Sequence, residues 1–147
     1  MRYLLRQLLL APFIILTILI TLLLPKRRQK FIWGPTPIIS NQYWADALRE
    51  AGYDAIVLLS TVPTVRRSTM IGFYYNDLVP RWVQPGGLRR LLGPCFALSY
   101  ILRRGKVIHL SFQGGPLGDT LFWWLEADLL RWAGVKNAMY MRWFFLT

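Results

Sequence analysis

The residues best suited to chemistry lie together in the stretch 106–120. It opens as a short run rich in β-branched and aromatic residues, which predicts a buried strand, and this run holds His109, the single histidine of the chain. An imidazole titrates near neutral pH, so His109 could act as a catalytic base or bind an acceptor group. A histidine in mid-strand also fits a hydrogen-bonded core residue, and both interpretations stay open.

A loop with three glycines and a proline follows this strand. Gln113 stands at the end of the strand, Gly114 and Gly115 come next, and Asp119 or Thr120 can cap the helix that follows. Backbone amides of such a loop can bind a phosphate, here one belonging to a lipid-linked acceptor. Loop geometry explains the glycines equally well, and capping explains Asp119. Because open α/β sheets bind ligands at strand–loop–helix junctions, we expect the functional site here.

A second glycine loop lies earlier in the chain. The apolar run 31–33 ends at Gly34 and Pro35, and Asn41 belongs to the predicted cap of a helix over 42–51 that closes at Gly52. Apolar side chains with helical spacing predict the buried face of this helix: Tyr43, Trp44, Ala47, Leu48 and Ala51.

The remaining elements predict an α/β fold, a Rossmann-like parallel sheet with flanking helices. The run 55–61 is apolar without alternation, as in a strand covered on both faces, and it completes a βαβ unit. The stretch 62–87 is irregular and predicts a long loop or broken elements. We expect a helix over 88–104, interrupted at 93–94, and a final strand over 137–146.

The helix predicted over 121–133 is apolar well beyond one stripe. Phe122, Leu125, Leu129 and Trp132 share one side, and Trp123 and Trp124 widen the apolar surface. A helix of this kind is buried on two sides or contacts a membrane or a partner protein.

The first segment, 1–30, is predicted to be a membrane anchor with a basic flank. Residues 8–24 are apolar apart from Pro12 and two threonines, and no small-x-small cleavage site follows, which favours an uncleaved transmembrane helix. More basic residues follow the helix than precede it, so we expect a single-pass protein whose domain faces the cytoplasm. A re-entrant or interfacial anchor on the same side is the alternative.

Charge and cysteine content narrow the classes of partner. The formal net charge is +11, and six of the eighteen basic residues lie at or before Lys30. This distribution favours membrane lipid as a partner, and without a recognised motif we expect no nucleic acid. Cys95 is the only cysteine, so we expect it to be a buried apolar residue in a reducing compartment; with one histidine besides, we expect no metal site.

Three segments resemble parts of family-4-type glycosyltransferases, which have the two-domain GT-B fold. Residues 31–54 (Phe-Ile-Trp-Gly-Pro-Thr-Pro-Ile-Ile-Ser-Asn-Gln-Tyr-Trp-Ala-Asp-Ala-Leu-Arg-Glu-Ala-Gly-Tyr-Asp) resemble their first strand, glycine loop and helix. Residues 107–115 resemble their His-x-His-Phe-Gly strand and loop, and 125–136 resemble the helix before the next strand. The resemblance covers about 31–140; the last strand lacks the family's Gly-Asp or Gly-Ser motif, and the second domain is missing.

The resemblance implies that 31–147 is an incomplete N-terminal, acceptor-side domain. It implies a membrane-associated glycosyltransferase that moves a sugar from a nucleotide-sugar to an envelope or lipid-linked glycan. The donor would bind a missing C-terminal domain or a catalytic partner subunit, and this half would bind no cofactor. His109 would be catalytic. The substrate-binding candidates are Gly34, Pro35, Asn41, Gln113, Gly114, Gly115 and Asp119. The alternatives are a non-catalytic membrane scaffold that recruits a separate catalytic half, and a truncated, inactive frame.

Overall fold

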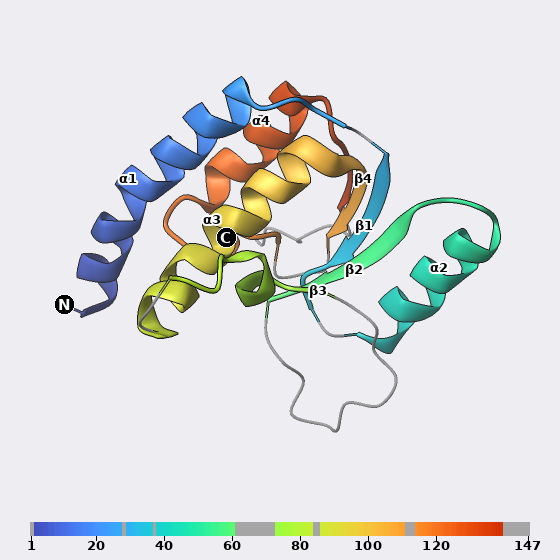
Figure 1. Cartoon of the computed structure of the whole chain (residues 1–147), viewed down its shortest axis with the longest axis horizontal. Coiled ribbons are helices and arrows are strands. Elements are labelled where there is room, and N and C mark those ends of the chain that lie inside the picture. Colours follow the sequence, from blue (N-terminus) through green and yellow to red (C-terminus); the bar gives the residue numbers. More distant parts are fainter. Residues whose placement is uncertain are drawn as a thin grey trace, which may run out of the picture.

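The computed structural model describes residues 2–27, 29–36, 38–60, 73–83, 86–110 and 114–139, and it has an α/β fold (Figure 1). Within these ranges, five parallel strands form one sheet in the order β3-β2-β1-β4-β5. The strands are β1 (Lys30–Gly34), β2 (Ala55–Leu59), β3 (Phe73–Tyr74), β4 (Gly105–Leu110) and β5 (Lys136–Met139). The predicted Rossmann-like sheet is therefore confirmed.

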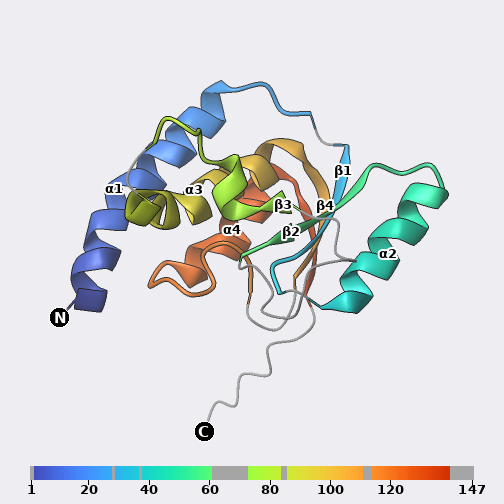
Figure 2. The ribbon, with the colours of Figure 1, turned by 60° about the horizontal axis from the view of Figure 1, so that its bottom comes forward.

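Helices cover both faces of this sheet. They are α1 (Arg2–Leu23), α2 (Ile39–Glu50), α3 (Gly86–Arg104) and α4 (Trp123–Ala133), and a 3-10 turn, η1 (Tyr75–Leu78), follows β3. Figure 2 shows α2 on one side of the sheet and α1, α3 and α4 on the other. Alternate residues of each strand point to opposite sides, so Ile32 packs toward α3 and α4 while Trp33 packs toward α2.

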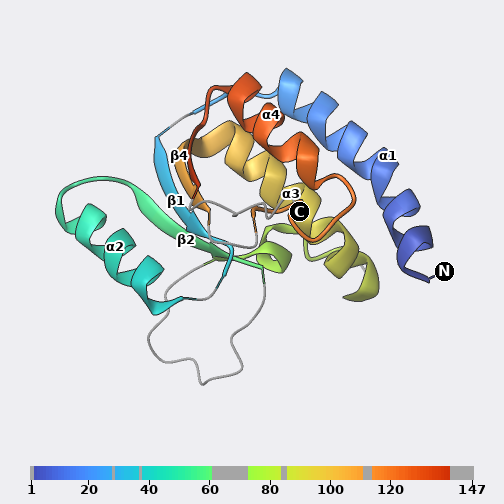
Figure 3. The ribbon, with the colours of Figure 1, turned by 180° about the vertical axis from the view of Figure 1, so that it is seen from behind.

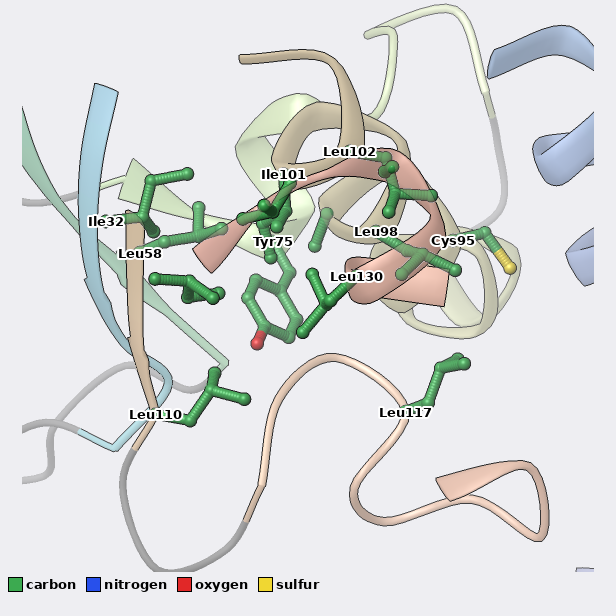
Figure 4. Packing of buried hydrophobic residues seen from close by; sticks show 14 of the residues in the cluster. Ile32, Leu58, Tyr75, Cys95, Leu98, Ile101, Leu102, Leu110, Leu117 and Leu130 are labelled. Atoms are coloured by element: carbon green, nitrogen blue, oxygen red, sulfur yellow. The ribbon is translucent and has the colours of Figure 1, made fainter. Parts of the chain in front are cut away.

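The main core lies between the sheet and helices α3 and α4 (Figure 4). Leu98 and Ile101 of α3 and Leu130 of α4 are fully buried there, and each such side chain contributes about 1.5–3 kcal/mol of transfer free energy. Cys95 lies at the edge of this cluster, as predicted for a small buried residue, and burial raises its pKa to about 11.

Helix α2 exposes much of the face that we predicted to be buried. It begins at Ile39, and its buried residues are Asn41, Gln42 and Ala45, whereas Tyr43 is 64% exposed. Two of the buried residues are polar and are held by hydrogen bonds: the Asn41 side-chain amide donates to the Thr36 carbonyl at 3.2 Å, and the Gln42 amide donates to the Asp46 carboxylate at 2.9 Å. The periodicity of apolar residues does not predict hydrogen bonds of this kind.

Two further elements differ from the prediction. The stretch expected to be irregular contains β3 and η1, and 61–72 and 84–85 lie outside the described residues. Helix α3 is continuous through Pro94. Leu91 before the proline and Leu98 after it pack in the same core, and the carbonyl that loses its donor belongs to Arg90, an exposed residue, where water can replace the bond.

The N-terminal helix is confirmed as α1, which is the one described helix long and apolar enough to cross a membrane. Its inner side packs on α3, and Leu10 and Ile14 join the main core. Helix α4 ends at Gly134, which adopts the left-handed conformation with φ 73°. The predicted last strand is present as β5, and 140–147 lie outside the described residues.

Candidate functional site

The two glycine loops leave the sheet at its topological switch point. Strands β1 and β4 are neighbours, and their last residues, Gly34 and Leu110, are paired in register. From there the chain continues to α2 on one face and to α4 on the other (Figure 1). Open α/β sheets bind ligands in the crevice at such a point. The fold thus brings both predicted loops to one edge, although Gln113 lies outside the described residues.

The residues of the first loop hold the loop against β2. A Cβ atom at Gly34 would collide with the carbonyl oxygen of Leu58, so only glycine allows this close approach. The Gly34–Pro35 peptide is cis, and the buried Pro35 offers its carbonyl to the Ser60 amide at 3.1 Å. Asn41 is buried and bonded to the loop as described above. Gly34, Pro35 and Asn41 therefore have structural roles at this edge.

The second loop encloses a carboxylate that the sequence analysis did not single out. Glu126 of α4 is 4% exposed, and its Oε2 atom accepts the Leu117 amide at 2.8 Å. Gly115 packs directly on this carboxylate, and a Cβ there would collide with Oε1. Gly114 has φ 81°, a left-handed conformation that favours glycine. Both glycines are thus explained by the path of the loop around Glu126.

The environment of Glu126 opposes its ionisation. Desolvation raises its pKa to about 7, although hydrogen bonds from the Leu117 and Gly115 amides lower it. Oε1 has no hydrogen-bond partner among the described residues. The neighbouring Tyr75 is buried, and its pKa is raised by burial first and then by the charges of Glu126 and Asp119.

The amides at the start of α4 also have partners within the chain. The Leu121 amide donates to Oε1 of Gln7 in α1 at 3.3 Å, and the Phe122 amide donates to the Thr120 hydroxyl at 3.2 Å. The predicted cap is wrong: α4 begins at Trp123, its N-cap position is Phe122, and no side chain caps it. Thr120 instead closes a turn before the helix, and the Asp119 side chain is exposed. A phosphate at this loop would have to displace the chain's own acceptors, Glu126 among them.

His109 lies on the opposite face of the sheet, in an aromatic cluster with Trp33 and Trp44. Its ring centroid is 4.2 Å from that of Trp33 and 5.7 Å from that of Trp44, and the two indoles meet edge to face at 5.0 Å. Burial lowers the pKa of His109, which favours the neutral imidazole.

One tryptophan of the aromatic cluster packs against the core, and the other is exposed at the surface. The Nε1 atom of Trp33 is buried without a hydrogen-bond partner among the described residues, whereas Trp44 is 46% exposed at the surface. Its members come from β1, α2 and β4, and Trp33 and His109 are paired across β1 and β4. This cluster has no signal in the sequence, because the contact between Trp33 and His109 depends on the register of two strands, which no local pattern records.

The described residues include no group of three histidine, cysteine, aspartate or glutamate side chains that could hold a metal ion. The donors and acceptors near the switch point are instead backbone amides, one buried carboxylate and one imidazole. Comparisons with models of protein families, with curated proteins and with solved structures found no match.

Proposed function

We propose that this chain is the acceptor-side half of a membrane-associated glycosyltransferase of the GT-B type. In this role it would take part in transfer of a sugar from a nucleotide-sugar to an envelope or lipid-linked glycan. The observation that carries the proposal is the aromatic cluster of Trp33, Trp44 and His109, one residue from the switch point. Small-molecule sites in general pair aromatic surface with a few polar groups, and a neutral imidazole can accept the proton of an attacking hydroxyl.

The donor side of the reaction would belong to another domain or subunit. This half would present the acceptor, and a C-terminal domain or partner chain would bind the nucleotide-sugar. Helix α1 would attach the complex to the membrane with the domain on the cytoplasmic side, as the basic residues after α1 favour.

A second role, a non-catalytic scaffold that recruits the catalytic half, is favoured by the second loop. Its amides are engaged by Glu126, Gln7 and Thr120 of the same chain. These three amides, of Leu117, Leu121 and Phe122, are therefore not free to bind an acceptor phosphate. In this role, membrane attachment and partner binding would be the functions of the chain.

The test is sugar transfer with the full chain purified in detergent, alone and with the proteins that copurify with it. Transfer from labelled nucleotide-sugars to lipid-linked acceptors should need the copurified partner. Transfer by the chain alone would contradict the scaffold role. Absence of transfer with every copurified partner and donor would contradict the glycosyltransferase proposal.

Variants in the aromatic cluster separate acceptor binding from scaffolding. Trp44→Ala should raise the KM for the acceptor about tenfold, the loss expected for one aromatic contact. The control Tyr43→Ala removes the neighbouring, more exposed ring of α2 and should leave KM unchanged. His109→Gln should lower kcat. Unchanged kinetics in both cluster variants would leave His109 a packing residue and favour the scaffold.

A further inference from the structure

We infer that α1 lies flat in the headgroup region of an anionic phospholipid bilayer while it stays packed on α3 and α4, and does not cross the bilayer. This inference rests on the membrane attachment proposed above and is independent of sugar transfer. The two sides of α1 have different surroundings. The inner side contacts the domain, and the outer side carries the exposed apolar residues.

Polar contacts hold the inner side of α1 at separate points along the helix. Near its start, Gln7 is buried and accepts the Leu121 amide at the beginning of α4. Near its end, the buried Thr21 donates to the Ser99 hydroxyl of α3 at 3.0 Å. These points are about 21 Å apart along the helix axis, at 1.5 Å per residue. The domain therefore accompanies α1 over most of its length.

Apolar packing and a backbone bond complete the attachment. Leu10 and Ile14 lie between the two polar contacts and are buried in the main core. Just after the helix, the Arg27 amide donates to the Arg103 carbonyl at the end of α3 at 2.9 Å. The whole inner side of α1 is thus a part of the folded domain.

A spanning arrangement is incompatible with this attachment. The apolar run 8–24 reaches the lower length limit for a spanning helix; it includes Thr21, and Gln7 would lie at its edge. If α1 spans, it can leave the domain, and it then loses the Gln7 contact and the buried packing of Leu10 and Ile14, while the Thr21 hydroxyl keeps its bond to the Thr17 carbonyl. Otherwise α3, α4 and their loops follow it into a region where irregular backbone finds no partners. An in-plane helix keeps every contact.

The outer side of α1 is suited to the interface. Its large exposed apolar side chains are Leu4, Leu5, Leu8, Leu9, Ile15, Leu16, Leu19, Ile20, Leu22 and Leu23. An uninterrupted surface of this kind is unusual against water. A helix that lies in the membrane plane inserts its apolar face about 5–10 Å into the boundary between headgroups and acyl chains, and α1, whose other side is covered by the domain, offers one apolar face for this.

Trp132 of α4 extends this surface, and Lys26 after α1 adds charge to it. Figure 3 shows α1 beside α4; Gln7 of α1 contacts Leu121 just before α4, and the Lys26 ammonium lies 4.8 Å from the centroid of the Trp132 ring. Trp132 is about half-exposed. Tryptophan and lysine side by side are typical of the headgroup level, and exposed lysine and arginine bind anionic lipid. The occupant of this surface is therefore an anionic bilayer.

A disulfide pair tests whether α1 stays on α3 in the membrane. In the full chain with Cys95→Ala, Thr21→Cys and Ser99→Cys replace two hydroxyls that are 3.0 Å apart. On vesicles of phosphatidylserine and phosphatidylcholine, this pair should oxidise at least tenfold faster than the control pair Leu19→Cys and Ser99→Cys, because Leu19 lies on the outer side.

A depth measurement separates the two orientations. Spin labels at single cysteines replacing Leu4, Leu16 and Leu23 should all lie at the same shallow depth in the vesicles. A spanning helix would place Leu16 near the bilayer centre and the other two at opposite surfaces. Binding should weaken at least tenfold on vesicles of phosphatidylcholine alone.

The outcomes decide the inference in each case. Rapid disulfide formation with equal depths supports it. Slow disulfide formation with a deep Leu16 overturns it in favour of a spanning helix. Rapid disulfide formation without vesicle binding overturns it by making α1 an ordinary core helix. Failure of sugar transfer leaves these measurements untouched and bears on the proposed function alone.

Discussion

Replacing Glu126 with glutamine should change how the stability of the domain depends on pH. The pKa of this carboxyl is raised from 4.5 to about 7 in the folded chain, chiefly by burial. Between these two values the folded state holds the proton more tightly than the unfolded state, so the free energy of unfolding falls as pH rises. The loss is complete above about pH 7 and amounts to ~3 kcal/mol, at 1.36 kcal/mol per pKa unit.

The glutamine variant has no proton to lose and should not show this decline. The difference between the two proteins should therefore change by ~3 kcal/mol between pH 4 and pH 8, with the wild type relatively weaker at high pH. The measurement is denaturant unfolding in detergent, followed by tryptophan fluorescence. Contributions from His109 are present in both proteins and cancel, and Tyr75 stays neutral throughout because its pKa is raised.

The matched control is Asp128→Asn, which removes an exposed carboxyl from the same helix. Its stability curve should run parallel to that of the wild type within about 0.5 kcal/mol. Parallel curves for the Glu126 variant would refute the reasoning, because they would show that the carboxyl ionises in the folded state as readily as in water. A wild type that gains stability with pH would show that the Leu117 and Gly115 amides outweigh desolvation.

Two further pairs of variants test local packing by the same unfolding measurement. Gly34→Ala should lower the free energy of unfolding by at least about 2 kcal/mol because its Cβ meets the Leu58 carbonyl, whereas Gly87→Ala, which meets open space in α3, should raise it by up to ~1 kcal/mol. Ile14→Ala on the inner side of α1 should cost about 2–5 kcal/mol, and Leu16→Ala on the outer side should cost less than about 0.5 kcal/mol while it weakens vesicle binding. Equal losses in either pair would contradict the packing described.

Elements that depend on a local pattern of residues could be predicted from the sequence. The unalternated run at 55–61 predicts a strand covered on both faces, and β2, which covers 55–59 of it, is buried throughout. The apolar run 8–24 likewise predicts a helix, and Gly134 marks the end of α4 through its left-handed backbone. The order of strands and helices then leads to the Rossmann-like sheet and to the switch point between β1 and β4.

The features that could not be predicted from the sequence are those that depend on contacts between distant segments. The glycines of the second loop suggested a bound anion, but the group that they enclose is the carboxyl of Glu126, and no periodic pattern marks a carboxyl that turns back onto the loop before its helix. His109 was visible as a candidate, whereas its contact with Trp33 depends on the pairing of two strands 76 positions apart in the sequence. Likewise, Gln7 is a single polar residue near the start of an apolar helix, and its role depends on the hydrogen bond from the distant Leu121 amide.

The contacts of α1 also bear on the order of events during synthesis. Thr21 and Ser99 are 78 positions apart, and Gln7 and Leu121 are 114 apart. At roughly 5–20 residues per second, a ribosome makes the partners of α1 roughly 4 to 20 s after the helix itself. On the interfacial arrangement inferred above, the nascent helix already rests on lipid during this interval. The bilayer then shields the apolar surface of α1 until the domain is complete and closes on its inner side.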